Sequence, residues 1–186
     1  LISDTVKNET IKSIELLNKK NINVVMLTGD NKTAAEVIAK KIGIDEFYYE
    51  LLPENKVEHI EQIISQTSDG KVAFVGDGIN DAPVLARADV GIAMGALGSD
   101  AAVETADIVL MSDSPLQVVH AIDIAERTRK IVWQNISFAL GVKSVFIILG
   151  VFGIATMWEA VFADVGVAIV AILNAMRVMN IGFTKE

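Results

Sequence analysis

The sequence has no cysteine among its 186 residues, which excludes a disulfide framework and any thiolate metal site built from this chain alone. It also has little positive charge, since 16 Lys and Arg stand against 24 Asp and Glu, for a net charge of −8. Without a basic patch to neutralise phosphates, nucleic acid is excluded as a partner. The first residues, LISD, show neither an initiator Met nor a signal peptide, so we expect the chain to start partway through a longer protein.

Charge is nearly absent from the last third of the chain. Residues 131–158 hold one charged side chain, Lys143, and residues 160–176 hold one, Asp164. Because a helix needs about 20 apolar residues to cross a bilayer, we predict two membrane spans, residues 136–155 and 158–179. A buried hairpin of a soluble protein is the alternative, and the length of both runs disfavours it.

Basic residues flank this apolar hairpin on one side only. Arg127, Arg129 and Lys130 precede the first span, Arg177 and Lys185 surround the end of the second, and the connection has none. The positive-inside rule therefore predicts that the soluble part and the C-terminus are cytosolic in a plasma or inner membrane. We divide the chain into a soluble domain, residues 1–125, and a membrane part, residues 126–186.

The soluble part alternates short apolar strands with amphipathic helices. This alternation predicts an α/β Rossmann-type domain with a parallel sheet covered on both faces. The predicted strands are residues 22–27, 71–75, 90–93 and 108–110. The predicted helices are residues 6–19, 33–42, 53–65, 82–88, 100–104 and 116–154.

Polar side chains follow two of these strands, where ligands of parallel sheets bind. Residues 28–30 (TGD) combine a hydroxyl, a backbone N–H and a helix start, which suits a phosphate. Residues 76–83 (GDGINDAP) place two carboxylates and a carboxamide after the second strand, which suits Mg²⁺. Each motif alone is more often an ordinary turn, but the pair at equivalent strand ends indicates a phosphate site. Lys56 could add a cation, although a single lysine is usually a solvated surface charge.

Three motifs together resemble the phosphorylation domain of P-type ATPases, which has a haloacid dehalogenase-like Rossmann fold. They are MLTGDN at 26–31, PENK at 53–56 and GDGINDAP at 76–83. The resemblance implies that Asp77 holds Mg²⁺ and that Asn80 and Asp81 bond around the phosphoryl group of a phospho-aspartate. It also implies that Thr28, Gly29 and Asp30 orient this group and that Lys56 neutralises its charge.

The phosphorylated aspartate of that family lies in the motif DKTGT, which this sequence does not contain. The resemblance therefore implies a C-terminal fragment that cannot complete the catalytic cycle alone. Its partners would be the lipid bilayer and the remainder of the pump, namely the actuator domain, the other membrane helices and the nucleotide-binding domain that holds most of the ATP.

The transported ion is suggested by two further segments. Residues 94–102 (MGALGSDAA) resemble the zinc-, cadmium- and lead-exporting branch, whereas copper pumps more often have GTGTD there. Copper pumps also tend to carry MxxS in the last helix, where this chain has FADVG at 162–166. By resemblance Asp164 binds the transported Zn²⁺, Cd²⁺ or Pb²⁺, and Lys143 lies close to it as a counter-charge.

Physical reasoning agrees, because a charge inside a span is costly and usually functional. We hypothesise that Lys143 pairs with Asp164 when metal is absent, the alternative being that Lys143 extends to the membrane interface. Three other readings stay open: a copper or potassium pump, a soluble phosphatase of the same superfamily, and a non-catalytic fragment. Asp164 argues against the first, and the apolar hairpin and the missing nucleophile argue against the second.

Overall fold

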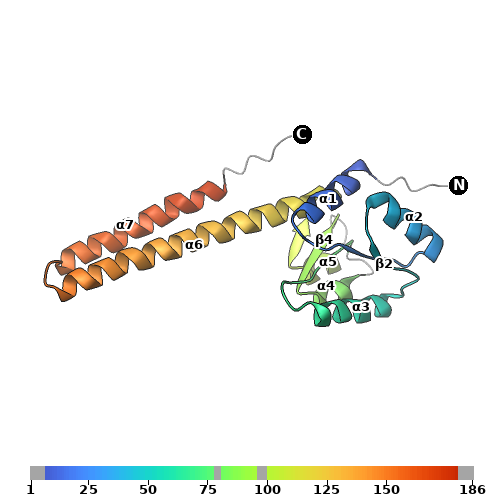
Figure 1. The fold of residues 1–186 in the computed structure, drawn as a ribbon, viewed down its shortest axis with the longest axis horizontal. Coiled ribbons are helices and arrows are strands. Elements are labelled where there is room, and N and C mark those ends of the chain that lie inside the picture. Colours follow the sequence, from blue (N-terminus) through green and yellow to red (C-terminus); the bar gives the residue numbers. More distant parts are fainter. Residues whose placement is uncertain (1–6, 78–80, 96–99, 180–186) are drawn as a thin grey trace. The chain divides into compact units, whose positions relative to one another are not determined.

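A computed structural model describes residues 7–77, 81–95 and 100–179 (Figure 1). The chain divides into two compact units, Leu1–Val119 and His120–Glu186. The division falls inside one continuous helix, so the domain boundary that we place after residue 125 remains a prediction.

The first unit contains five described strands, all paired in parallel as predicted. They form two sheets instead of the single sheet expected from the sequence. One sheet pairs β1 (Val25–Leu27) with β2 (Glu46–Tyr48), and the other has the order β3 (Ala73–Gly76), β4 (Val90–Met94), β5 (Ile108–Leu110). Strand β2 was not predicted, because its three residues follow a polar turn and start with a glutamate.

Five helices precede or connect these strands, close to their predicted positions. They are α1 (Asn8–Lys19), α2 (Lys32–Ile42), α3 (Pro53–Gln66), α4 (Ala82–Arg87) and α5 (Asp100–Thr105). The ends of α2 follow helix-capping rules: the Asn31 side chain accepts the N–H of Ala34, and Gly43 ends the helix at a φ of 77°.

Two hydrophobic clusters form the core of this unit. The larger joins α3, β3, α4 and β4, and Leu27 of β1 packs against it. Its buried members are Ile60, Phe74, Val84, Leu85 and Ala93. The smaller cluster has Ile14, Ile42 and Ile44 as its buried members. Coverage of the sheets is incomplete, contrary to expectation, since Val75 of β3 is 38% exposed.

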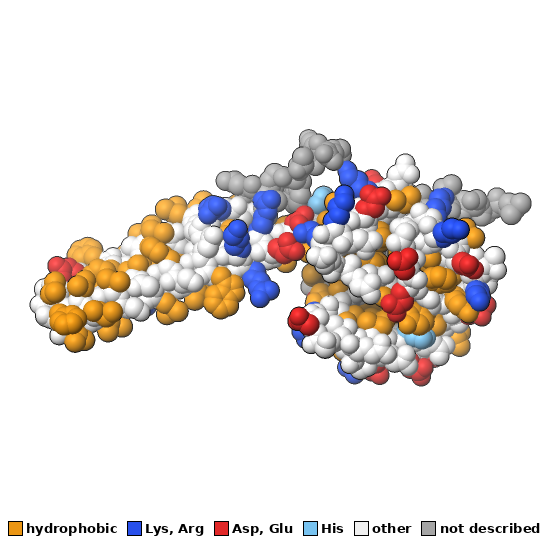
Figure 2. All heavy atoms as spheres, in the orientation of Figure 1, with side chains coloured by type: hydrophobic (Ala, Val, Ile, Leu, Met, Phe, Trp, Pro, Cys, Tyr) orange, Lys and Arg blue, Asp and Glu red, His pale blue; other side chains and the backbone are white. Residues whose placement is uncertain are grey.

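The second unit is a helical hairpin. Helix α6 (Leu116–Val151), which starts in the first unit, and α7 (Met157–Ala175) are followed by a short 3-10 turn, Met176–Val178. Both helices are long and apolar enough to cross a membrane. Figure 2 shows hydrophobic side chains spread over their surface, and several are highly exposed, among them Ile147 at 67% and Phe162 at 75%. Such an apolar exterior suits contact with lipid or with further membrane helices.

Candidate functional site

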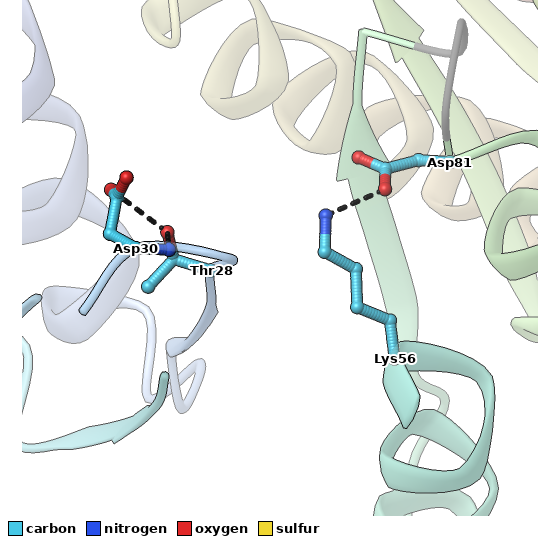
Figure 3. A network of polar contacts seen from close by, with 4 residues as sticks. All are labelled: Thr28, Asp30, Lys56 and Asp81. Carbon is cyan, nitrogen blue, oxygen red and sulfur yellow. Dashed lines mark hydrogen bonds and ion pairs between the residues drawn. The ribbon is translucent and has the colours of Figure 1, made fainter. Parts of the chain in front are cut away.

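The loop after β1 holds Thr28 and Asp30 against each other (Figure 3). The Thr28 hydroxyl donates to the Asp30 carboxylate at 3.0 Å and accepts the Asp30 N–H at 3.1 Å. Backbone hydrogen bonds from Thr28 to Tyr48, from Leu51 to Thr28 and from Glu50 to Asp30 fix this loop to the segment after β2. The unpredicted strand therefore supports one half of the predicted phosphate site.

Gly29 allows the close approach between this loop and the segment after β2. A Cβ at this position would lie 3.3 Å from the Leu51 carbonyl oxygen, which is tighter than most Cβ contacts. Because the adjacent Asn31 caps α2, the polar loop sits at a helix start, where anions are favoured.

The second half of the site follows β3, where Asp77 comes directly after the strand and Asp81 begins α4. The Asp81 carbonyl accepts the N–H groups of Val84 and Leu85, both at 2.9 Å, which fixes the start of the helix. Gly76 leaves room for the carboxylate, since a Cβ there would lie 3.1 Å from Asp81 Oδ2. Asn80, which the resemblance assigns to hydrogen bonding around the phosphoryl group, lies outside the described residues.

Lys56 and Asp81 form an ion pair, although they lie 25 residues apart in the sequence. Lys56 Nζ lies 2.7 Å from Asp81 Oδ1, and the two side chains are only 17% and 14% exposed. The lysine is placed by the start of α3, where Pro53 occupies the first turn and Asn55 Oδ1 accepts the Leu52 N–H at 3.3 Å. Figure 3 shows the Lys56 side chain extending from α3 to the carboxylate.

The carboxylates of this loop fit a magnesium ion by their chemistry. Mg²⁺ is commonly held by one or two carboxylates together with waters and phosphate oxygens, and Asp77 and Asp81 supply two carboxylates at one strand end. No group of three or more His, Cys, Asp or Glu side chains able to hold a metal occurs within the described ranges. The donor set therefore matches a site completed by water and phosphate.

Two groups of the first unit have shifted pKa values, Tyr48 beside the Thr28 loop and Asp89 at the opposite end of β3 and β4 from Asp77. A hydrogen bond to the Glu46 carboxylate raises the pKa of Tyr48, whose carbonyl also receives the Thr28 N–H. Hydrogen bonds from Lys71 and then from the Val72 N–H lower the pKa of Asp89, which ties the turn after α4 to the start of β3.

In the helical hairpin, Lys143 and Asp164 form an ion pair. Lys143 Nζ lies 3.0 Å from Asp164 Oδ1, so the structure brings together the two charges that the sequence places deep within the predicted spans. An amide cluster involving Asn135 and Asn174 also joins α6 to α7. This cluster was not predicted, although two asparagines in apolar helices were a usable signal.

Comparison with known proteins agrees with this architecture. Residues 1–89 match the family of haloacid dehalogenase-like hydrolases. The chain is 59% identical over 179 residues to a zinc-transporting ATPase of Synechocystis sp., covering 96% of this chain and 25% of that protein. It is 57% identical to a cadmium, zinc and cobalt-transporting ATPase of Bacillus subtilis, covering 97% of this chain and 26% of that protein.

The structural comparison gives the same result. A crystal structure of a zinc-transporting PIB-type ATPase in the E2.Pi state superposes with a TM-score of 0.88 at 39% identity, covering 96% of this chain and 29% of that one. The chain thus spans about a quarter of the length of the curated relatives that it matches.

The fold and the site define a haloacid dehalogenase-like hydrolase domain joined to a pair of membrane helices. Given the similarity over nearly its whole length, the chain belongs to the P-type ATPases, within the branch that includes zinc- and cadmium-transporting members. With two candidate spans and membrane pumps as relatives, it is an integral membrane protein.

Proposed function

We propose that this chain is part of an ATP-driven pump that exports a divalent heavy metal, Zn²⁺, Cd²⁺ or Pb²⁺, through a phospho-aspartate intermediate. The first unit contributes part of the phosphoryl-transfer site, and the hairpin contributes part of the transport site. Relatives described as zinc- or cadmium-transporting support this choice of ion.

The observation that carries the proposal is the Lys143–Asp164 pair, at 3.0 Å. A carboxylate within a span needs a partner, because charge in the bilayer is costly. Aspartate oxygens are also ordinary ligands of Zn²⁺. Asp164 therefore binds the transported metal, and Lys143 neutralises this carboxylate when the metal is absent.

In the phosphoryl-transfer site, residues of this chain position and neutralise the reacting group. Thr28, Gly29 and Asp30 orient the phosphoryl group, and the Lys56 ammonium has three donors, so it can bond Asp81 and a phosphoryl oxygen together. Asp77 and Asp81 would hold Mg²⁺, which when bound neutralises negative charge on the transferring phosphoryl group, and Asn80 and Asp81 would form hydrogen bonds around that group.

The rest of the full-length protein would supply the phosphorylated aspartate, the actuator domain, the remaining membrane helices and the domain that binds ATP. Basic residues flank the two predicted spans in the sequence and are absent from their connection, which supports an orientation with both ends of the pair in the cytosol. They are Arg127, Arg129, Lys130, Arg177 and Lys185.

The proposal is tested by metal-stimulated ATP hydrolysis of the full-length protein with Zn²⁺, Cd²⁺, Pb²⁺ and Cu⁺. We expect the divalent ions to stimulate hydrolysis and Asp164→Asn to abolish this stimulation. The matched control is Glu159→Gln, an acidic residue of α7 whose carboxylate accepts the N–H of Thr156 at 2.7 Å. Stimulation by Cu⁺ alone, or an unaffected Asp164→Asn protein, would overturn the choice of ion and site.

A further inference from the structure

A cluster of amide side chains connects α6 to α7 well away from the Lys143–Asp164 pair. Asn174 Nδ2 lies 2.8 Å from Asn135 Oδ1 and 3.3 Å from Gln134 Oε1. Asn135 Nδ2 in turn donates to the carbonyl oxygen of Ala171 at 3.0 Å. Each asparagine thus bonds to the opposite helix, and we call these two residues the amide clamp.

The orientation of the Asn174 amide is determined by its neighbour Arg177. The Arg177 guanidinium donates to Asn174 Oδ1 at 2.9 Å. Because arginine has no acceptor, the Asn174 oxygen must face Arg177, and its nitrogen must then face Asn135 and Gln134. The clamp therefore has one consistent pattern of donors and acceptors.

The clamp and the ion pair belong to a single antiparallel register of the two helices. Lys143 follows Asn135 by eight residues along α6, which is about 12 Å at 1.5 Å per residue. Asp164 precedes the two contacts on α7, at Ala171 and Asn174, by seven and ten residues, or about 10–15 Å. The same alignment of α6 and α7 thus satisfies both sets of contacts.

The clamp is better suited than the ion pair to select this register. Apolar side chains gain no hydrophobic driving force for helix association in a bilayer, since lipid is as apolar as they are, so polar contacts between the helices contribute to the choice of register. Lysine has a flexible four-carbon stem, so the ion pair alone defines the register less sharply than a contact between short side chains, although its attraction weakens as the two charges move apart. The short asparagine side chains tolerate less change of alignment. Sliding α7 by one residue displaces a contact by about 1.5 Å and turns it by about 100° around the helix.

We propose that Asn135 and Asn174 are positioning residues, which fix the alignment of α6 and α7 at which Lys143 holds the metal-binding carboxylate of Asp164. This inference rests on the proposed function, because it assumes that Lys143 competes with the transported metal for Asp164. Without the clamp, α7 can slide or rotate, and Lys143 then competes less effectively.

The test measures how strongly Lys143 weakens zinc binding, with and without the clamp. Equilibrium zinc binding is measured on the full-length protein in detergent, and binding that remains in Asp164→Asn is subtracted as background. With the clamp intact, Lys143→Met removes the competitor and should tighten zinc binding about tenfold, within the usual range of coupling between sites. In the Asn174→Leu background the same substitution should change affinity by about twofold or less.

Leu173→Ala is the matched control, since this neighbouring residue of α7 is 60% exposed and is not part of the clamp. It should leave the tenfold effect of Lys143→Met unchanged. If the Asn174→Leu protein does not assemble, Asn135→Ala takes its place in the test, because it removes the same contact from the α6 side.

The possible failures are distinguishable. A tenfold effect that persists in Asn174→Leu overturns the amide clamp and leaves the proposed function intact. No effect of Lys143→Met with the clamp intact overturns the counter-charge role of Lys143, and the clamp proposal falls with it. Stimulation of ATP hydrolysis by divalent metal tests the pump itself independently of both.

Discussion

Replacing Gly91 of β4 with alanine should destabilise the first unit by forcing α4 away from the sheet. The new Cβ would lie 2.6 Å from the carbonyl oxygen of Leu85 and 3.1 Å from its carbonyl carbon. Ordinary contact begins at 3.4 Å, so the strand and the helix would have to separate by 0.8 Å, the difference between 3.4 and 2.6 Å. The opposing atoms are backbone, which a change of rotamer cannot move.

Neither side of this contact can move easily. Gly91 is fixed by two hydrogen bonds to Asp107, its N–H donating to Oδ2 at 2.8 Å and its carbonyl accepting the Asp107 N–H at 2.9 Å. On the opposite side, Leu85 is 1% exposed and Val84 is fully buried. Overpacking a tight core costs about 1–3 kcal/mol, and we expect a loss of stability in this range.

Amide hydrogen exchange of β4 and α4 provides the assay, because it reports the free energy of local opening. We expect Gly91→Ala to increase exchange at Leu85 and Ala93 about 5–150-fold, which corresponds to about 1–3 kcal/mol. Gly141→Ala in α6 is the control, since nothing lies within 4 Å of its added Cβ. Unchanged exchange in Gly91→Ala, or an equal effect of Gly141→Ala, would refute the reasoning.

Three further substitutions test other parts of the first unit by urea unfolding. Gly43→Ala should lower the free energy of unfolding by about 1 kcal/mol through backbone strain alone, since φ is 77° and no atom lies within 4 Å of the added Cβ. A variant as stable as wild type would contradict this expectation. Lys56→Met should lower the free energy of unfolding by about 3 kcal/mol, because it leaves the Asp81 carboxylate without its cation. The double variant with Asp81→Asn should lose less stability, and equal losses in the two variants would exclude this cause. Asp89→Asn should lower the free energy of unfolding at pH 7, because the hydrogen bond from Lys71 lowers the pKa of Asp89 and so stabilises the folded state. The difference in stability from wild type should shrink as the pH falls from about 4 through this lowered pKa. A difference that is constant with pH would contradict this cause.

Local sequence signals predicted most elements but not their pairing. Strand β5 was predicted with its observed bounds, and α2 was predicted within one residue, because Asn31 and Gly43 are strong capping signals. β2 was missed since its stability comes from pairing with β1, 21 residues earlier, and not from a long apolar run. The split into two sheets likewise depends on neighbours in space, which a local pattern does not specify.

For the candidate site too, the sequence predicted the residues better than their contacts in space. The motifs identified Thr28, Asp30, Lys56, Asp77 and Asp81 by residue type and by their places at strand or helix ends, but their roles remain proposals. The Lys56–Asp81 contact was not predictable, because it depends on how α3 packs beside β3. For Lys143 and Asp164 the scarcity of charge made a pairing easy to predict, and the ion pair is present.

The two-sheet arrangement has a consequence for the order in which the first unit folds. Paired strand residues lie close in sequence, as in Val25 with Glu46, Ala73 with Val90, and Ile92 with Ile108. Such short loops close with little loss of entropy, so each sheet can form early and separately. The loop of Thr28 and the Lys56–Asp81 pair belong to different sheets, and their association depends on packing such as that of Leu27 against the larger cluster. Kinetically, the proposed phosphate site should therefore be among the last features of this unit to form.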